Sequence, residues 1–265
     1  MKLQVLISTM HRTDTSFSGA MNLPSDALII NQVDKPLDEI TDTQNGKQVK
    51  MLSFCERGLS KSRNRALENA DGDICVIADE DILFEDGCKE KILEAHQKYP
   101  GYDIIAFIAK RNAPGRQKRY YDKPTKMGYI RSMKILSCEI SVKRKAIVEN
   151  GIRFNESFGT GSGKYLMGEE NIFLYSCLKK GLKILFLPIT FCSVSEAQSS
   201  WFFGWNEKLF YDKGAISYEM SPLFSIPLIL QFAVRKYPTY KNKMSFFAAV
   251  KAMMHGRRQH KNSLK

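Results

Sequence analysis

Residues 74–83 read ICVIADEDIL, an apolar run that ends in three consecutive acids, Asp79, Glu80 and Asp81, before the chain turns apolar again. The run is too short for a membrane span, and its β-branched residues predict a buried strand over 73–81. Ligands of open α/β sheets bind at the carboxyl ends of the strands. This stretch therefore indicates both a fold class and the edge of the sheet that carries a site.

Apolar runs and helical stretches alternate on both sides of this strand. Further strands are expected at 3–9, 26–32, 47–54, 103–110 and 182–188, and helices at 58–70, 88–99 and 171–181. Such alternation is typical of an α/β domain with a largely parallel sheet. We predict a Rossmann-like domain over residues 1–215, with a mixed, mostly parallel sheet flanked by helices and a long polar loop at 111–128.

The charge of the chain is unevenly placed. The sequence has 265 residues, 43% of them hydrophobic, and a formal net charge of +12. No acid follows Glu219, whereas nine bases do: Arg235, Lys236, Lys241, Lys243, Lys251, Arg257, Arg258, Lys261 and Lys265. We therefore expect residues 216–265 to form a separate, basic and helical C-terminal extension.

The C-terminal segment alternates apolar and basic stretches. Residues 223–234 are mostly apolar but too few to cross a bilayer, and residues 244–254 place apolar side chains among bases. Two interpretations fit this pattern. Residues 221–265 bind an anionic membrane surface, or they pack on the domain and leave a solvated basic face.

Cysteine usage and the first residues bear on the compartment. The six cysteines are scattered, without the paired spacing of a zinc site or a redox pair. The opening MKLQVLISTM lacks the cleavage pattern of a signal peptide and reads as a first strand. We expect a cytoplasmic protein, and a peripheral position on the inner face of the cytoplasmic membrane if the C-terminal segment binds lipid.

The acids at the end of the strand are of the type that binds hard cations. In an extended chain, alternation sends Asp79 and Asp81 to one side and Glu80 to the other. Two carboxylates suit Mg²⁺ or Mn²⁺, which complete their ligand shell with phosphate and water. A solvated strand end without a ligand fits the same three letters.

Two blocks of the sequence resemble glycosyltransferase family 2. The first is GLSKSRNRALENADGDICVIADED (58–81), in which a helix, an Ala-x-Gly-Asp turn and a strand lead into a D-x-D motif. The second is IRFNESFGTGSGKYLMGEENIFLYSCLKKGLKILFLP (152–188), which resembles the family's Phe-Asp-Glu-x-Phe-Gly and Gly-Glu-Asp segments. VLISTMHR (5–12) resembles the family's first strand more loosely, and the whole resemblance covers roughly residues 3–200.

The resemblance implies a GT-A fold and an inverting, metal-dependent glycosyltransferase. The donor would be a nucleotide-diphosphate sugar, and the acceptor a hydroxyl of a glycan or lipid-linked molecule in surface polysaccharide synthesis. Asp81 would bind Mn²⁺ or Mg²⁺, and Asp79 would lie beside the metal and the ribose. Ser195 or Glu196 occupies the region in which the family often has a metal-binding His.

The same resemblance implies the residues around the nucleotide. Thr9 and Arg12, after the first strand, would contact the nucleoside. Arg63 and Asn64 would lie on the helix beside the nucleotide. Asn31 or Gln32, with Asp34 as a further alternative, stands where the family usually has two acids that read the nucleobase, so the identity of the base stays open.

The segment GEEN (168–171) supplies the implied catalytic carboxylates. Glu170 would take the proton of the acceptor hydroxyl as a general base, and Glu169 would bind the acceptor or orient the base. Both acids also suit the first turn of the helix that follows, where the helix dipole favours negative charge. The two roles are compatible.

Two other classes of function fit the composition less well. A nucleotidyltransferase shares the α/β fold and the metal chemistry, but STMHRTDTSFSG (8–19) is a poor match to its expected Gly-rich, basic loop. A nucleic-acid binder would carry a basic stripe across the main domain, whereas the bases concentrate in the C-terminal segment. No nucleic acid is expected as a partner.

Overall fold

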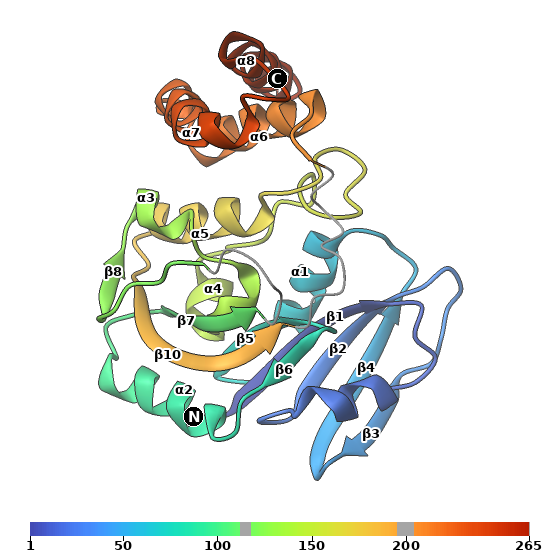
Figure 1. The fold of residues 1–265 in the computed structure, drawn as a ribbon. Helices are drawn as coiled ribbons and strands as arrows, with labels where there is room; N and C mark the ends of the chain where they lie inside the picture. The colour runs from blue at the N-terminus through green and yellow to red at the C-terminus, as the bar shows by residue number, and fades with distance from the viewer. Residues whose placement is uncertain (112–117, 195–203, 265) are drawn as a thin grey trace.

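The computed structural model describes residues 1–111, 118–194 and 204–264. It consists of an α/β part, built on a long sheet, and a lobe of three helices that lies above the sheet in Figure 1. We call these three helices the helical lobe. They are α6 (Glu207–Met220), α7 (Ser225–Tyr240) and α8 (Phe246–Asn262).

Ten described strands form the sheet, in the order β3-β4-β2-β1-β5-β9-β7-β10-β6, with β8 paired to β10. Strands β4, β2, β1 and β5 run parallel to one another, and β9 enters antiparallel between β5 and β7. The strands are β1 (Leu3–Met10), β2 (Ala27–Gln32), β3 (Ile40–Gln44), β4 (Lys47–Phe54), β5 (Ile74–Asp79), β6 (Ile82–Phe84), β7 (Ile104–Arg111), β8 (Thr125–Met127), β9 (Ile140–Lys143) and β10 (Ile184–Val194).

Helices cover both faces of the sheet (Figure 1). One face packs on α1 (Leu59–Asn69), α4 (Arg144–Glu149) and α5 (Glu169–Lys179). The other face packs on α2 (Cys88–Lys98) and the short helix η1 (Ser16–Met21). Two short elements, α3 (Tyr129–Ser132) and η2 (Ser137–Glu139), lie before β9. Because β1, β2 and β5 are covered on both faces, they are apolar along nearly their whole length, as parallel strands of this class are.

The expected fold class is confirmed: a mixed sheet with a mostly parallel core, flanked by helices and followed by a helical C-terminal region. The expected strand over 73–81 ends at Asp79, and Glu80 and Asp81 form the turn into β6. The boundary proposed after residue 215 lies inside α6, which runs on to Met220.

The helical lobe has its own core and is joined closely to the α/β part. A methyl group added to Gly214 of α6 would meet the backbone oxygen of Met253 in α8 at 1.8 Å, so these two helices cross in backbone contact. Within the lobe Phe210, Ile229 and Tyr240 are fully buried. The other side of α6 packs on α5 and its preceding loop. Of the helices described, none combines the length and the apolar character needed to traverse a membrane.

Candidate functional site

The carboxyl ends of three parallel strands bring predicted site residues to one edge of the sheet. In β1, Ser8 pairs with Asp79 of β5, and Thr9 pairs with Asn31 of β2. Alignment of this kind follows from parallel pairing, since the carboxyl ends of such strands meet at the same edge. The edge is the one at which α/β sheets hold their ligands.

Arg63 connects the two acidic motifs of the chain. It lies on α1 with its side chain only 3% exposed. Its Nη2 lies 3.2 Å from Oδ1 of Asp79, and its Nη1 lies 3.2 Å from Oε1 of Glu169. Nη2 also donates to the Ser137 hydroxyl at 2.8 Å. Burial opposes the charge of Arg63, but the carboxylates of Asp79, Glu169 and Glu170 outweigh it and leave the pKa of Arg63 raised.

Glu80 lies against Thr9 and Arg12, a position that alternation along an extended strand does not predict. The Thr9 hydroxyl donates to its Oε2 at 2.5 Å, and the Nη2 of Arg12 lies 3.0 Å from the same oxygen. The side chain turns toward β1 because the strand ends at Asp79 and the next two residues form a turn. Glu80 therefore fixes both residues that the resemblance assigns to the nucleoside.

Asp81 and Asp79 form the part of the site suited to a cation. Burial, followed by the negative charge of Asp79, raises the pKa of Asp81. A divalent cation would relieve that repulsion, and Mg²⁺ or Mn²⁺ needs only one or two carboxylates when a diphosphate supplies further oxygens. Across the described ranges, three or more His, Cys, Asp or Glu side chains do not gather in a metal-holding group. The two carboxylates thus fit a metal that is shared with a phosphate ligand.

Three predicted nucleotide-binding residues have their amide groups occupied by the protein itself. Asn31 accepts from the backbone N–H of Arg12 at 3.1 Å and donates to its carbonyl at 2.8 Å. The Gln32 amide bonds the N–H and the carbonyl of Gly58, just before α1. Asn64 bonds the N–H and the carbonyl of Phe154. All three are buried, and these contacts favour a role in positioning the chain around the site over direct contact with a nucleotide.

Glu169 and Glu170 open helix α5, as expected. Glu169 is nearly buried, and its carboxylate packs against Gly159, where an added methyl group would lie 3.1 Å from Cδ of Glu169. Burial, followed by the charge of Glu169, raises the pKa of Glu170 to about 7. Glu169 is thus ion-paired with Arg63, while the pKa of its neighbour Glu170 lies near neutrality. This pairing of environments suits a general base.

The helical lobe contributes a cation to the same acids. Lys213 of α6 is half-buried and interacts electrostatically with Glu170 and Glu169, while burial lowers its pKa. Its Nζ lies 5.7 Å from the ring centre of Phe232 in α7. No local signal in the sequence marks Lys213 or Ser137, because both reach the site from distant elements. The sequence therefore does not predict either residue as part of the site.

Other polar and aromatic side chains of the chain have structural partners. Glu139 is buried and binds Lys118 at 2.5 Å, and Ser141 bonds the buried His96 at 2.8 Å. Trp205 packs on aromatic rings of the lobe, including Phe210. Ser195 and Glu196, which occupy the region of the family's metal-binding His, lie outside the described residues.

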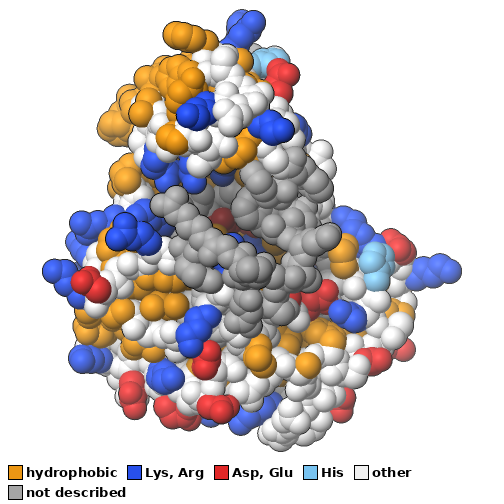
Figure 2. Space-filling model, in the orientation of Figure 1, with side chains coloured by type: hydrophobic (Ala, Val, Ile, Leu, Met, Phe, Trp, Pro, Cys, Tyr) orange, Lys and Arg blue, Asp and Glu red, His pale blue; other side chains and the backbone are white. Residues whose placement is uncertain are grey.

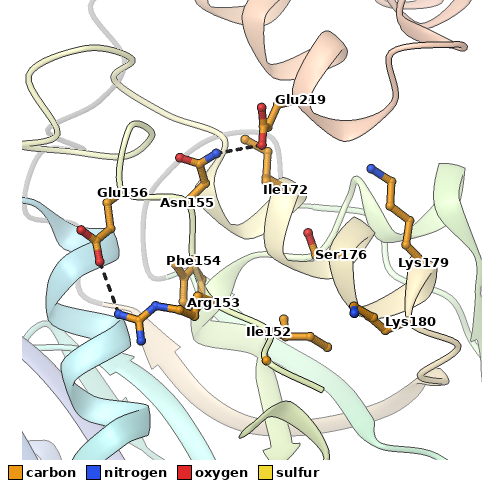
Figure 3. A pocket seen from close by; sticks show the side chains of 11 residues that line it. Ile152, Arg153, Phe154, Asn155, Glu156, Ile172, Ser176, Lys179, Lys180 and Glu219 are labelled. Atoms are coloured by element: carbon orange, nitrogen blue, oxygen red, sulfur yellow. Dashed lines mark hydrogen bonds and ion pairs between the residues drawn. The ribbon is translucent and has the colours of Figure 1, made fainter. Parts of the chain in front are cut away.

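A separate cavity of about 450 Å³ lies on the outer side of α5 and contains none of the predicted site residues. Figure 3 shows Arg153, Ser176 and Lys179 around it. Glu219 reaches it from α6 and accepts from the Asn155 amide at 2.8 Å. The opposite carboxylate oxygen of Glu219 lies 2.6 Å from Nε2 of the buried His260 in α8. The cavity therefore borders the joint between the lobe and the α/β part.

Comparison with known proteins identifies the domain. Residues 31–162 match the model of glycosyl transferase family 2, a range that includes Arg63, Asp79 and Asp81 and ends before Glu169. No curated protein matches the sequence.

Among solved structures, S. aureus TarS 1-349 in complex with UDP-GlcNAc aligns with 99% of this chain and 89% of its own, at 14% identity and a TM-score of 0.61. The same protein in complex with UDP gives 15% identity, coverage of 100% and 83%, and a TM-score of 0.61. At such identities the likeness establishes a GT-A-like fold. The family match shows that this chain carries a glycosyl transferase family 2 domain, matched over residues 31–162.

Proposed function

We propose that the chain transfers a sugar, with inversion, from a nucleotide-diphosphate donor to a hydroxyl of a glycan or lipid-linked acceptor. The observation that carries this proposal is the position of Arg63 between Asp79 and Glu169. It brings the acids suited to a diphosphate-bound cation next to the acids suited to proton removal. An inverting transfer needs both at one bond.

The donor would lie along the edge of the sheet. Thr9 and Arg12, both held by Glu80, would contact the nucleoside, and Asn31 would fix the backbone of Arg12. Asp81 and Asp79 would hold Mn²⁺ or Mg²⁺ against the diphosphate. When bound, such a cation stabilises the negative charge that develops on the departing diphosphate.

Glu170 would remove the proton from the acceptor hydroxyl. The oxygen of that hydroxyl forms a bond to the anomeric carbon, the bond from that carbon to the phosphate oxygen breaks, and the proton ends on Glu170. A base with a pKa of about 7 is well matched to this work near neutral pH. Arg63 and Lys213 would keep Glu169 and Glu170 at the acceptor side.

The donor and the acceptor class follow from different observations. TarS was solved with UDP-GlcNAc, which makes uridine-diphosphate sugars the first donors to test. The basic segment after Glu219 supports a lipid-linked acceptor in surface polysaccharide synthesis, reached from the cytoplasmic side of the membrane.

The test measures release of nucleoside diphosphate and transfer to acceptor with Mn²⁺ or Mg²⁺ across a panel of nucleotide sugars. Asp81→Asn is expected to lose diphosphate release, and Glu170→Gln to lose transfer by about 10²-fold to 10⁴-fold while still binding donor. Asp122→Asn and Glu90→Gln, both exposed and remote from this edge, are the matched controls and keep wild-type rates.

The results separate this proposal from its rivals. Full activity in both Asp81→Asn and Glu170→Gln would refute the assigned roles. Release of pyrophosphate in place of nucleoside diphosphate would identify a nucleotidyltransferase. A product that retains the donor's anomeric configuration would exclude the direct attack described above.

A further inference from the structure

The outer face of α7 carries a continuous apolar stripe. Ile226, Leu230, Val234 and Tyr237 recur at helical spacing, one on each successive turn, and all are exposed. Leu230 is 44% exposed and Val234 64%. Figure 2 shows apolar side chains gathered over the part of the lobe that contains α7. A soluble helix ordinarily turns such a stripe inward.

The stripe is held outward by the packing on the other side of the helix. Leu228, Ile229 and Ala233 are buried in the lobe, and Ser225 accepts from Nε of Arg257 in α8 at 2.7 Å. Rotation of α7 to hide the stripe would expose these buried residues. The apolar face is therefore a fixed surface of the lobe.

Basic side chains lie near the C-terminal end of the stripe. Lys241 and Lys243 follow the end of α7, and both are exposed. Phe247, at the start of α8, is 82% exposed near the same turn. The sequence after Glu219 contains no Asp or Glu. An apolar face followed in the chain by exposed bases is complementary to a surface with negative headgroups above an apolar interior.

A second element of the same type lies on the α/β part. Helix α3 exposes Tyr129 and Ile130, the latter at 60%, with Lys126 and Arg131 exposed beside them. In Figure 1 α3 lies on the same side of the molecule as α7. The apolar and basic character of this side thus extends from the lobe to the neighbouring α/β part.

We propose that the outer face of α7 lies in the surface of an anionic lipid bilayer, with Leu230 and Val234 among the acyl chains and Lys241 and Lys243 among the headgroups. The inference deepens the proposed function. It rests on that function only in one respect, namely that a position at the bilayer would bring the enzyme to a lipid-linked acceptor. The contact itself requires neither donor nor acceptor.

A second copy of the chain is a poorer occupant for this face. A two-fold contact across α7 would set its unbalanced positive charge against the same charge on the partner, which is unfavourable. An anionic bilayer satisfies the apolar stripe and the bases together. Because no described helix is suited to span the membrane, the contact would be peripheral.

The experiment is vesicle co-sedimentation of the full chain without substrates, using phosphatidylglycerol-containing vesicles and pure phosphatidylcholine vesicles. The wild type is expected to bind the anionic vesicles. The double variant Leu230→Ser/Val234→Ser should lose at least about tenfold in partition, because two aliphatic side chains no longer enter the bilayer. Its matched control is Leu83→Ser/Val148→Ser, which changes residues of similar exposure on the α/β part.

A second pair of variants tests the charge. Lys241→Gln/Lys243→Gln should reduce binding to anionic vesicles by about tenfold, since each base near the surface adds to the attraction. Lys91→Gln/Lys98→Gln, on the exposed side of α2, is the control and should bind as the wild type does.

Each outcome supports or overturns the inference. Wild type that leaves anionic vesicles unbound, or unchanged binding in Leu230→Ser/Val234→Ser, overturns it. A wild-type dimer that the same variant converts to a monomer in light scattering also overturns it, in favour of a second copy. Wild type that cleaves donor but does not bind anionic vesicles would refute this inference alone, whereas wild type that binds the vesicles but cleaves no donor would refute the proposed function alone.

Discussion

The edge of the sheet and the helical lobe treat charge in opposite ways. At the edge, Asp79 and Glu169 share Arg63, and Glu80 pairs with Arg12. In the lobe, the sequence after Glu219 contains nine bases and no acid, and many of these bases are exposed. Most of the net charge of +12 therefore belongs to the segment after Glu219, and it carries no information about the chemistry of the sheet edge.

Buried ion pairs and exposed charges of one sign have different physical effects. Paired charges that are buried fix geometry, because removal of one partner leaves the other without compensation. Exposed charges of one sign act on large partners at a distance and weaken with added salt. Disturbing the paired charges should therefore have the largest effect, followed by the packing within the lobe and then by the titration of a single carboxyl group.

The largest effect is expected from Arg63→Met. The substitution leaves Asp79 and Glu169 facing each other without their shared cation, and should cost about 3 kcal/mol in the free energy of unfolding. Catalysis should fall below detection as well. The measurement is urea unfolding followed by a transfer assay, with Arg65→Met as the control, since Arg65 lies on the same helix and its side chain is 43% exposed. Equal stability of the two variants would contradict the bridging role.

A smaller effect is expected from Gly214→Ala, which tests the joint within the lobe. The added methyl group meets the backbone oxygen of Met253 at 1.8 Å, so α6 and α8 must move apart. Overpacking of this type should cost about 2 kcal/mol and lower Tm by several degrees. Gly101→Ala meets nothing within 4 Å and serves as the control. If the two variants have the same Tm, the close crossing of α6 and α8 is not important for stability.

The smallest effect is expected from pH. Glu170 has a raised pKa of about 7, so its ionised form, which accepts a proton, grows as pH rises through that value. The transfer rate should rise about tenfold between pH 6 and pH 8. Glu170→Gln should remove this dependence from the residual rate. A wild-type rate that stays flat over this interval would assign the base to another residue.

Much of the fold was predictable because its signals are local. The strands at 74–79 and 27–32 are short apolar runs, and α2 follows a turn at Asp86 and Gly87. Several residues that carry the family resemblance lie at the carboxyl ends of strands. The edge of the sheet that holds the candidate site was therefore predictable once the fold class was predicted. The register that sets Thr9 opposite Asn31 is a direct result of parallel pairing.

The roles within the site were less accessible, since they depend on contacts between distant segments. Arg63 and Glu169 are separated by 106 positions, and the sequence alone gives no reason to pair them. Asn31, Gln32 and Asn64 have the polar groups of ligand-binding residues, but whether an amide meets a nucleotide or a backbone carbonyl is decided by tertiary packing. Alternation along a strand predicts that Glu80 points away from Asp79 and Asp81. It does not apply to Glu80, because the strand ends at Asp79.

The C-terminal segment shows the same limit. Its pattern allowed either packing on the domain or contact with lipid, and α7 has both a buried and an exposed apolar face. Leu228 and Ile229 are buried, while Leu230 and Val234 are exposed. When both faces of a helix are apolar, the sequence does not show which face is buried against the rest of the protein.

The bridge made by Arg63 has an energetic consequence. Asp79 and Glu169 belong to different motifs and lie on different elements, yet each sets how strongly Arg63 holds the other. Their substitutions should therefore be non-additive: the free-energy cost of Asp79→Asn with Glu169→Gln should differ from the sum of the two single costs. The strand that ends in acid and the helix that begins with acid are thus one thermodynamic unit, in which a change to either motif alters the other.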